Sequence, residues 1–198
     1  MEISATLVKE LREATGAGVL ECRKTLEETK GDMERAVALL KEKGLAKAAK
    51  KAEREVKDGR IEVYGHPGNR VGVLLEVNCE SDFVADTEDF KALVHDLALH
   101  IAFANPRYAR PEDIPAEALE AQRATFHAEA VATGKPANVL ERIVQGKLDK
   151  FYDETCLLRQ PFVKDDKVKV GNLITEAIAK IGENIVVRRF VRYELGKD

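Results

Sequence analysis

Few side chains in this sequence have the types and spacing that bond-making chemistry requires. His95 and His100 lie five residues apart on one predicted helix, about 500° of rotation, so they point to different faces. His66 falls in a predicted turn and His127 on a polar helix. A metal ion needs three or four converging ligands, and neither the number nor the spacing of these histidines predicts a metal site.

The nucleophilic residues are equally scattered. Cys22, Cys79 and Cys156 form no CxxC pair, and Cys22 and Cys156 fall on apolar helical faces, where we expect them to fill the core. Ser4 and Ser81 are the only serines, and neither has the flanking glycines of a nucleophile elbow. Phosphate-binding glycine motifs are also missing. We therefore expect no catalytic residue, no metal and no cofactor, in a protein that is not an enzyme.

One short stretch between a predicted strand and a predicted helix is a candidate functional loop. Apolar side chains recur at every second position in Val71, Val73, Leu75 and Val77, which predicts a half-buried strand. Asp82 and Phe83 follow shortly after its end. Loops at the ends of elements often carry function. The pattern alone favours a plainer interpretation, in which Ser81 or Asp82 caps the next helix and Phe83 packs into the core.

Composition and charge narrow the class of protein. The 198 residues include 32 basic and 35 acidic side chains, so the net charge of −3 argues against a dedicated nucleic-acid binder. A hydrophobic content of 44% excludes a disordered chain. No apolar run is long enough to cross a bilayer, and residues 1–6 lack the pattern of a secretory signal. Three unpaired cysteines fit the reducing cytoplasm, where we expect the protein.

Periodicity predicts an α+β fold with a helical N-terminal domain. Residues 1–44 read as three short helices, with Gly44 closing the third. Residues 45–58 are rich in alanine and charge, which predicts an exposed helical linker. Residues 59–198 predict a core in which a three-stranded antiparallel sheet is packed by helices. Its expected parts are a hairpin over 60–77, helices from about 86 to 105 and over 116–132, 136–158 and 173–181, a loop over 160–167, and a last strand over 185–195 that pairs with the hairpin.

Four separated segments resemble the elongation factor Ts family, and they occur in the family's order over nearly the whole chain. They are residues 11–18, 76–85, 160–163 and 185–195. The resemblance implies a guanine-nucleotide exchange factor that binds elongation factor Tu·GDP and promotes GDP release by disturbing the Mg²⁺ and phosphate site. It also implies a ubiquitin-associated-like (UBA-like) domain over 1–44, the linker over 45–58, and a dimerisation core over 59–198, because short members of the family act as two-fold dimers.

The resemblance also assigns partner-binding residues. Ser81, Asp82, Phe83 and Val84 match the family's threonine-aspartate-phenylalanine-valine motif, with serine keeping the hydroxyl. Arg12, Val19 and Leu20 match the N-terminal contact surface, where the family often has methionines at the last two positions.

Three alternatives follow from other features. A UBA-like adaptor would bind a partner without altering nucleotide exchange. An RNA-associated translation protein would use the basic stretch over 41–60, although exposed lysines are more often a solvated helix face. A hydrolase is the weakest alternative, because no nucleophile–base pair is evident.

Overall fold

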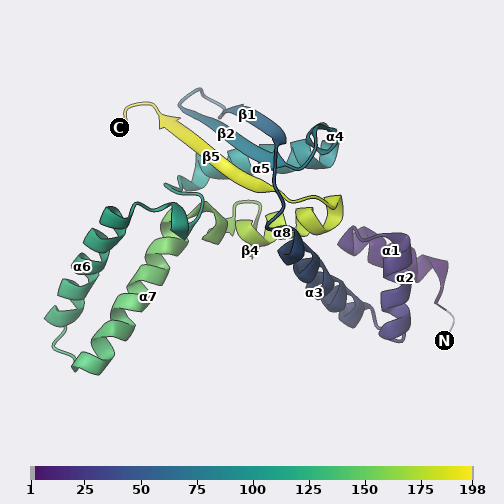
Figure 1. The fold of residues 1–198 in the computed structure, drawn as a ribbon, viewed down its shortest axis with the longest axis horizontal. Helices are drawn as coiled ribbons and strands as arrows, with labels where there is room; N and C mark the ends of the chain where they lie inside the picture. The colour runs from purple at the N-terminus through teal and green to yellow at the C-terminus, as the bar shows by residue number, and fades with distance from the viewer. Residues whose placement is uncertain (1–2, 198) are drawn as a thin grey trace. The chain divides into compact units, whose positions relative to one another are not determined.

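A computed structural model describes residues 3–197 and confirms the predicted α+β fold. The chain forms two compact units, one from residues 1–60, 77–93 and 173–186 and one from residues 61–76, 94–172 and 187–198. Residues 1, 2 and 198 of the predicted domains lie outside the described residues. The longer elements are α1 (Ala5–Thr15), α2 (Val19–Glu28), α3 (Met33–Lys51), β1 (Asp58–Gly65), β2 (Val71–Cys79), α5 (Glu88–Ala104), α6 (Ala116–Ala132), α7 (Ala137–Thr155), α8 (Val170–Ile181) and β5 (Val186–Glu194) (Figure 1).

The first three helices pack around a small core of their own. The Ser4 side chain caps α1 by accepting the Leu7 N–H at 3.2 Å, and Asp32 caps α3 by accepting the Arg35 N–H at 3.0 Å. The buried side chains are those of Val8, Leu11, Cys22, Leu26, Ala36 and Leu40. The prediction of three helices is confirmed, while the likeness to a UBA domain stays a prediction.

The third helix does not end at Gly44, and this part of the prediction is wrong. The helix continues to Lys51, and Gly44 lies inside it where the helix approaches α8. A Cβ atom at position 44 would lie 3.2 Å from the Ala179 Cβ, so glycine permits the close approach. Ala48 is buried, and the Lys51 ammonium donates to the Gly182 carbonyl. The stretch expected to be an exposed linker is therefore half helix and partly packed.

Strands β1, β2 and β5 form an antiparallel sheet in that order, which confirms the predicted pairing of the last strand with the hairpin. The hairpin turns where the sequence predicts, with Gly68 and Asn69 at φ 92° and 54° and the His66 N–H donating to the Val71 carbonyl at 2.9 Å. Gly59 has φ 149°, and a Cβ there would lie 2.3 Å from the Val77 carbonyl oxygen. Glycine at 59 thus lets β1 run tightly against the end of β2.

Within the second unit, α5 contacts one side of the sheet. His95 Nδ1 lies 2.9 Å from a Glu62 carboxylate oxygen, and its ring meets that of Tyr64 edge-on. Further along, Arg192 Nε donates to the Ala102 carbonyl at 3.1 Å. Glu62, Tyr64 and Arg192 therefore face α5, and their neighbours along the strands face away from it.

Helices α6 and α7 lie side by side as an antiparallel hairpin (Figure 1). Ala130, Val144 and Leu148 form its buried core, and Arg123 pairs with Glu141 at 2.9 Å. Both helices were predicted, and the second ends a few residues earlier than expected.

A small two-stranded sheet, β3 (Pro161–Phe162) and β4 (Asp165–Lys169), replaces the loop predicted over 160–167. A buried histidine holds its start. The His100 ring is 1% exposed, its Nε2 lies 2.9 Å from Gln160 Oε1, and its Nδ1 accepts the Val163 N–H at 3.2 Å. This pair of contacts requires a neutral ring with the proton on Nε2.

The buried ring predicts a loss of stability in mild acid. Burial lowers the pKa of His100 below its usual value, so below about pH 6.5 the unfolded chain takes up a proton that the folded protein does not. Stability is therefore full above that pH and falls as the pH drops through it. We expect the urea midpoint to fall between about pH 7.5 and pH 5.5, and His100→Gln to reduce that fall. A His66→Gln variant is the control, since His66 is exposed; an equal effect of both variants would contradict the assignment.

Candidate functional site

The chain forms a tight helical turn directly after β2. Ser81 is the N-cap of α4 (Asp82–Ala85), and its hydroxyl oxygen accepts the Val84 N–H at 3.4 Å. A second cap follows, because Thr87 Oγ1 accepts the Phe90 N–H at 3.3 Å and α5 begins at Glu88. Of the two caps that the sequence left open, Ser81 and Asp82, the structure has Ser81, but it caps a separate four-residue turn and not the long helix that was expected.

Side chains on this turn point in two directions. Val84 and Ala85 are each 7% exposed and anchor the turn. Phe83 is 79% exposed, so the interpretation that its ring packs into the protein's own core is wrong. The reason is local: Val84 and Ala85 occupy the buried positions of a turn too short to bury a third side chain.

Asp82 is exposed beside the phenylalanine ring. Its carboxylate accepts the Phe83 N–H at 2.7 Å, and it forms no ion pair within residues 3–197. An acidic group and an aromatic ring thus stand next to each other on the surface, and both are exposed.

The carboxylate of Glu183 holds the backbone of this turn, and sequence reasoning missed it. One of its oxygens accepts the N–H groups of Glu80 and Ser81, both at 3.0 Å, and the other accepts the Ser81 hydroxyl at 2.6 Å. Burial, with the nearby charge of Glu183, raises the pKa of the Cys79 thiol to about 11. Cys79 is therefore a buried, protonated thiol and not a nucleophile.

The sequence contains only a weak indication that Glu183 has a structural role. Gly182 ends α8 with φ 94°, and a polar pair, Glu183 and Asn184, follows before a strand. Such turns are usually solvated, whereas here Asn184 is 2% exposed. Nothing in the spacing indicates that this turn meets a segment about a hundred residues earlier.

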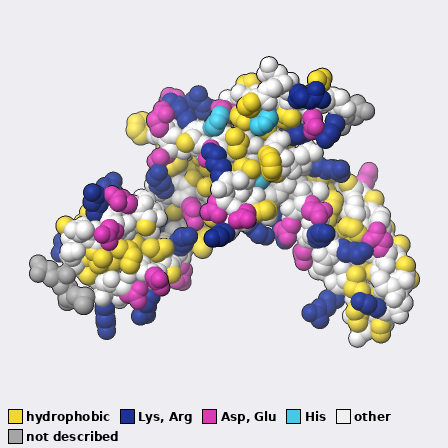
Figure 2. Space-filling view, turned by 180° about the vertical axis from the view of Figure 1, so that it is seen from behind, with side chains coloured by type: hydrophobic (Ala, Val, Ile, Leu, Met, Phe, Trp, Pro, Cys, Tyr) yellow, Lys and Arg dark blue, Asp and Glu magenta, His cyan; other side chains and the backbone are white. Residues whose placement is uncertain are grey.

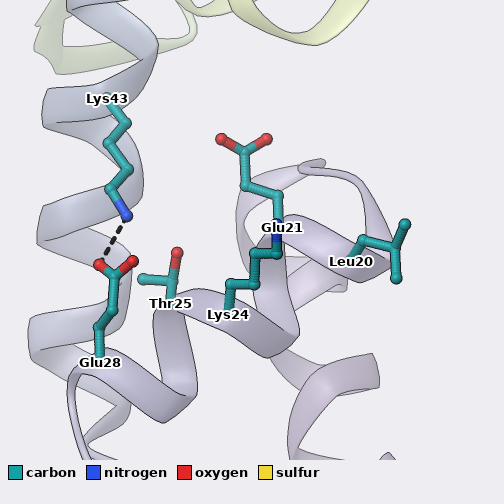
Figure 3. Close-up of a pocket in the computed structure, with 6 residues that line it drawn as sticks. All are labelled: Leu20, Glu21, Lys24, Thr25, Glu28 and Lys43. Carbon is teal, nitrogen blue, oxygen red and sulfur yellow. Dashed lines mark hydrogen bonds and ion pairs between the residues drawn. The ribbon is translucent and has the colours of Figure 1, made fainter.

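The three N-terminal residues assigned by resemblance are all on the surface. Arg12 lies in the last turn of α1, and Val19 and Leu20 begin α2 with exposed fractions of 52% and 77%. Leu20 lines one end of a hollow of about 330 Å³, with Glu21, Lys24, Thr25, Glu28 and Lys43. Figure 3 shows the Lys43–Glu28 ion pair at the end of the hollow away from Leu20.

Most cationic side chains of the basic stretch over 41–60 have partners. Lys43 pairs with Glu28 at 2.7 Å, Lys47 pairs with Glu21, and Arg54 lies 3.5 Å from Glu80. Basic and acidic side chains are interspersed over the face shown in Figure 2. This mixture leaves little unopposed positive charge for a phosphate backbone.

Further features of residues 3–197 concern metal sites, accessible cysteines and membrane-spanning helices. Residues 3–197 contain no cluster of three or more side chains suited to binding a metal. Cys22 and Cys156 are fully buried, as predicted. None of the helices described is both long and apolar enough to cross a membrane.

Comparison with known proteins agrees with these features. The family described as elongation factor TS matches residues 2–197. The chain is 57% identical to an elongation factor Ts of Herpetosiphon aurantiacus over the full length of both proteins. It is 55% identical to those of Carboxydothermus hydrogenoformans and Heliobacterium modesticaldum, over 98% of this chain and 90% and 91% of theirs.

Matches of this extent define the class of protein, a translation elongation factor that takes part in protein biosynthesis. The chain belongs to the elongation factor Ts family.

Proposed function

We propose that this protein is a guanine-nucleotide exchange factor that binds elongation factor Tu·GDP and promotes GDP release by disturbing the Mg²⁺ and phosphate site. It makes and breaks no covalent bond. The observation that carries the proposal is the exposed pair Asp82 and Phe83, which projects from a turn whose neighbours are buried. An exposed, anchored aromatic residue is suited to enter an apolar cleft of a partner.

The contacts of the turn suggest a role for each of the four motif residues. Phe83 enters an apolar cleft between helices of the GTPase, and Asp82, which has no ion pair within residues 3–197, displaces a group that orients the Mg²⁺ shell. Ser81 caps the turn and Val84 anchors it, so these two residues give the turn its shape. GDP affinity depends on the metal and on donors around the phosphates, so disturbing that site is sufficient to release the nucleotide.

The energies require a second contact surface. Accelerating release by about 10³–10⁵-fold takes roughly 4–7 kcal/mol of differential binding. Burying one phenylalanine contributes only about 1.5–3 kcal/mol. We therefore assign additional binding energy to the exposed N-terminal residues Arg12, Val19 and Leu20, which include the arginine and large apolar types suited to anchoring.

A second copy of this chain is the proposed partner of the sheet. Ile61, Val63, Leu74, Val191 and Tyr193 are exposed by 59%, 78%, 46%, 39% and 74%. Since their neighbours Glu62, Tyr64 and Arg192 face α5, Ile61, Val63, Val191 and Tyr193 lie on the opposite face. A sheet face that carries these exposed apolar side chains is suited to a two-fold contact between identical sheets.

Truncating either exposed residue of the turn is expected to slow catalysed GDP release. Phe83→Ala and Asp82→Ala should each lower the rate at least about tenfold, because each removes an interaction needed to open the nucleotide site. Stopped-flow release of fluorescent GDP from elongation factor Tu measures this. Phe103→Ala is the matched control, since Phe103 is also exposed, by 75%, but lies on α5. Unchanged rates in both turn variants would refute the role of the turn, and binding without any acceleration by the unaltered protein would favour an adaptor.

The N-terminal surface is expected to contribute affinity. Arg12→Ala and Leu20→Ala should each raise the Kd for elongation factor Tu about five- to thirtyfold, since each removes about 1–2 kcal/mol of contact. Point substitutions are cleaner than deleting residues 1–44, because α3 continues to Lys51. Calorimetry gives the Kd, with Leu45→Ala as control because Leu45 is 52% exposed on α3. Wild-type affinity in both variants would rule this surface out.

A charge on the open sheet face is expected to separate a dimer. We predict that the unaltered protein sediments as a dimer at micromolar concentration and that Val63→Lys sediments as a monomer, because the charge would be buried in the contact. Val131→Lys, at a 51% exposed site on α6, is the control. A monomeric unaltered protein, or a dimeric Val63→Lys variant, would contradict the proposed interface.

A further inference from the structure

We propose that Glu183 is a positioning residue for nucleotide exchange, because its carboxylate fixes the backbone from which Asp82 and Phe83 project. The inference rests on the proposed function and adds a residue to which neither the resemblance nor the comparisons assign a role. Glu183 does not lie on the turn; it follows α8, about a hundred residues later in the chain.

Three donors converge on this one carboxylate. The two consecutive N–H groups of Glu80 and Ser81 both donate to Oε2 at 3.0 Å, and the Ser81 hydroxyl donates to Oε1 at 2.6 Å. Hydrogen bonds to an ionised acceptor are shorter and stronger than neutral ones. Together they set the orientation of two successive peptide units immediately before α4.

The Ser81 hydroxyl transmits this constraint to the turn. While its proton is donated to Glu183, its oxygen accepts the Val84 N–H at 3.4 Å. Both functions of the hydroxyl are therefore used, and its direction is determined by the carboxylate. Without Glu183, the hydroxyl can rotate toward water or backbone, and the two N–H groups lose their acceptor.

The segment that carries Glu183 is itself held in place. The Asn184 N–H donates to Glu80 Oε1 at 2.6 Å, so each of two glutamates holds the backbone next to the other. Asn184 Nδ2 also donates to the carbonyls of Ala52 and Arg54, at 3.3 Å and 2.8 Å. This reciprocal arrangement makes the carboxylate a fixed acceptor rather than a mobile surface charge.

Two substitutions of Glu183 distinguish the loss of the hydrogen-bond acceptor from the loss of the negative charge. Glu183→Ala removes the acceptor, and we expect the maximal rate of GDP release to fall at least about tenfold while the half-saturating concentration changes less than about threefold. Glu183→Gln retains an oxygen for the two N–H groups and should recover most of the rate. Glu176→Ala, which removes an exposed carboxylate on α8 that pairs with Lys41 at 3.8 Å, should have no effect.

Hydrogen exchange supplies a readout that does not depend on the GTPase. In Glu183→Ala the amides of residues 80–85 should exchange faster, while those of the α1–α3 core stay unchanged. A rate within twofold of the unaltered protein, unchanged exchange at residues 80–85, or a Glu183→Gln variant as slow as Glu183→Ala would each overturn the inference. If the unaltered protein itself fails to accelerate release, the proposed function fails, and the exchange data still decide whether Glu183 positions the turn.

Discussion

Two backbone N–H groups and one hydroxyl meet on the carboxylate of Glu183, and the direction of α4 follows from that meeting. A helical turn of four residues is unstable alone, because nucleation fixes several dihedral angles for very few hydrogen bonds. The turn persists because Ser81 caps one end and Val84 and Ala85 are buried beneath it. Once these groups are in place, Phe83 has only an outward direction open to it.

The surfaces proposed to bind partners are built in a common way. Phe83 precedes buried Val84, Leu20 lies in the first turn of a helix whose Cys22, two residues on, is fully buried, and Val63 precedes buried Tyr64. In each case the apolar side chain is largely exposed, while a residue one or two positions on is buried and anchors the backbone. Apolar area is thereby offered to a partner without loosening the fold that presents it.

Sequence reasoning succeeded where the determinants are local. The alternation over 71–77, the periodicity of 116–132 and the cap at Ser81 depend on neighbouring residues, and all three are found in the structure. The orientation of Phe83 could not be read from pattern, because phenylalanine and valine are both residue types that are often buried and the two stand side by side here. The family motif, and not the hydrophobic pattern, indicated an outward ring.

The errors concern contacts between distant segments. Gly44 has the signature of a helix end, yet it lies inside α3, where its missing side chain permits the close approach of Ala179 from α8. The sequence indicated the role of Glu183 only weakly, because its partners, Glu80 and Ser81, belong to another part of the chain. Glycine propensity and turn composition describe one segment at a time, whereas these two positions are decided by packing between segments.

The outward ring of Phe83 has a kinetic consequence. No internal contact of that ring must break before a partner can meet it, because the side chain is already 79% exposed. Encounter on this side is then limited by diffusion and orientation rather than by a conformational change. For this ring, no change of its own conformation has to precede contact with a partner.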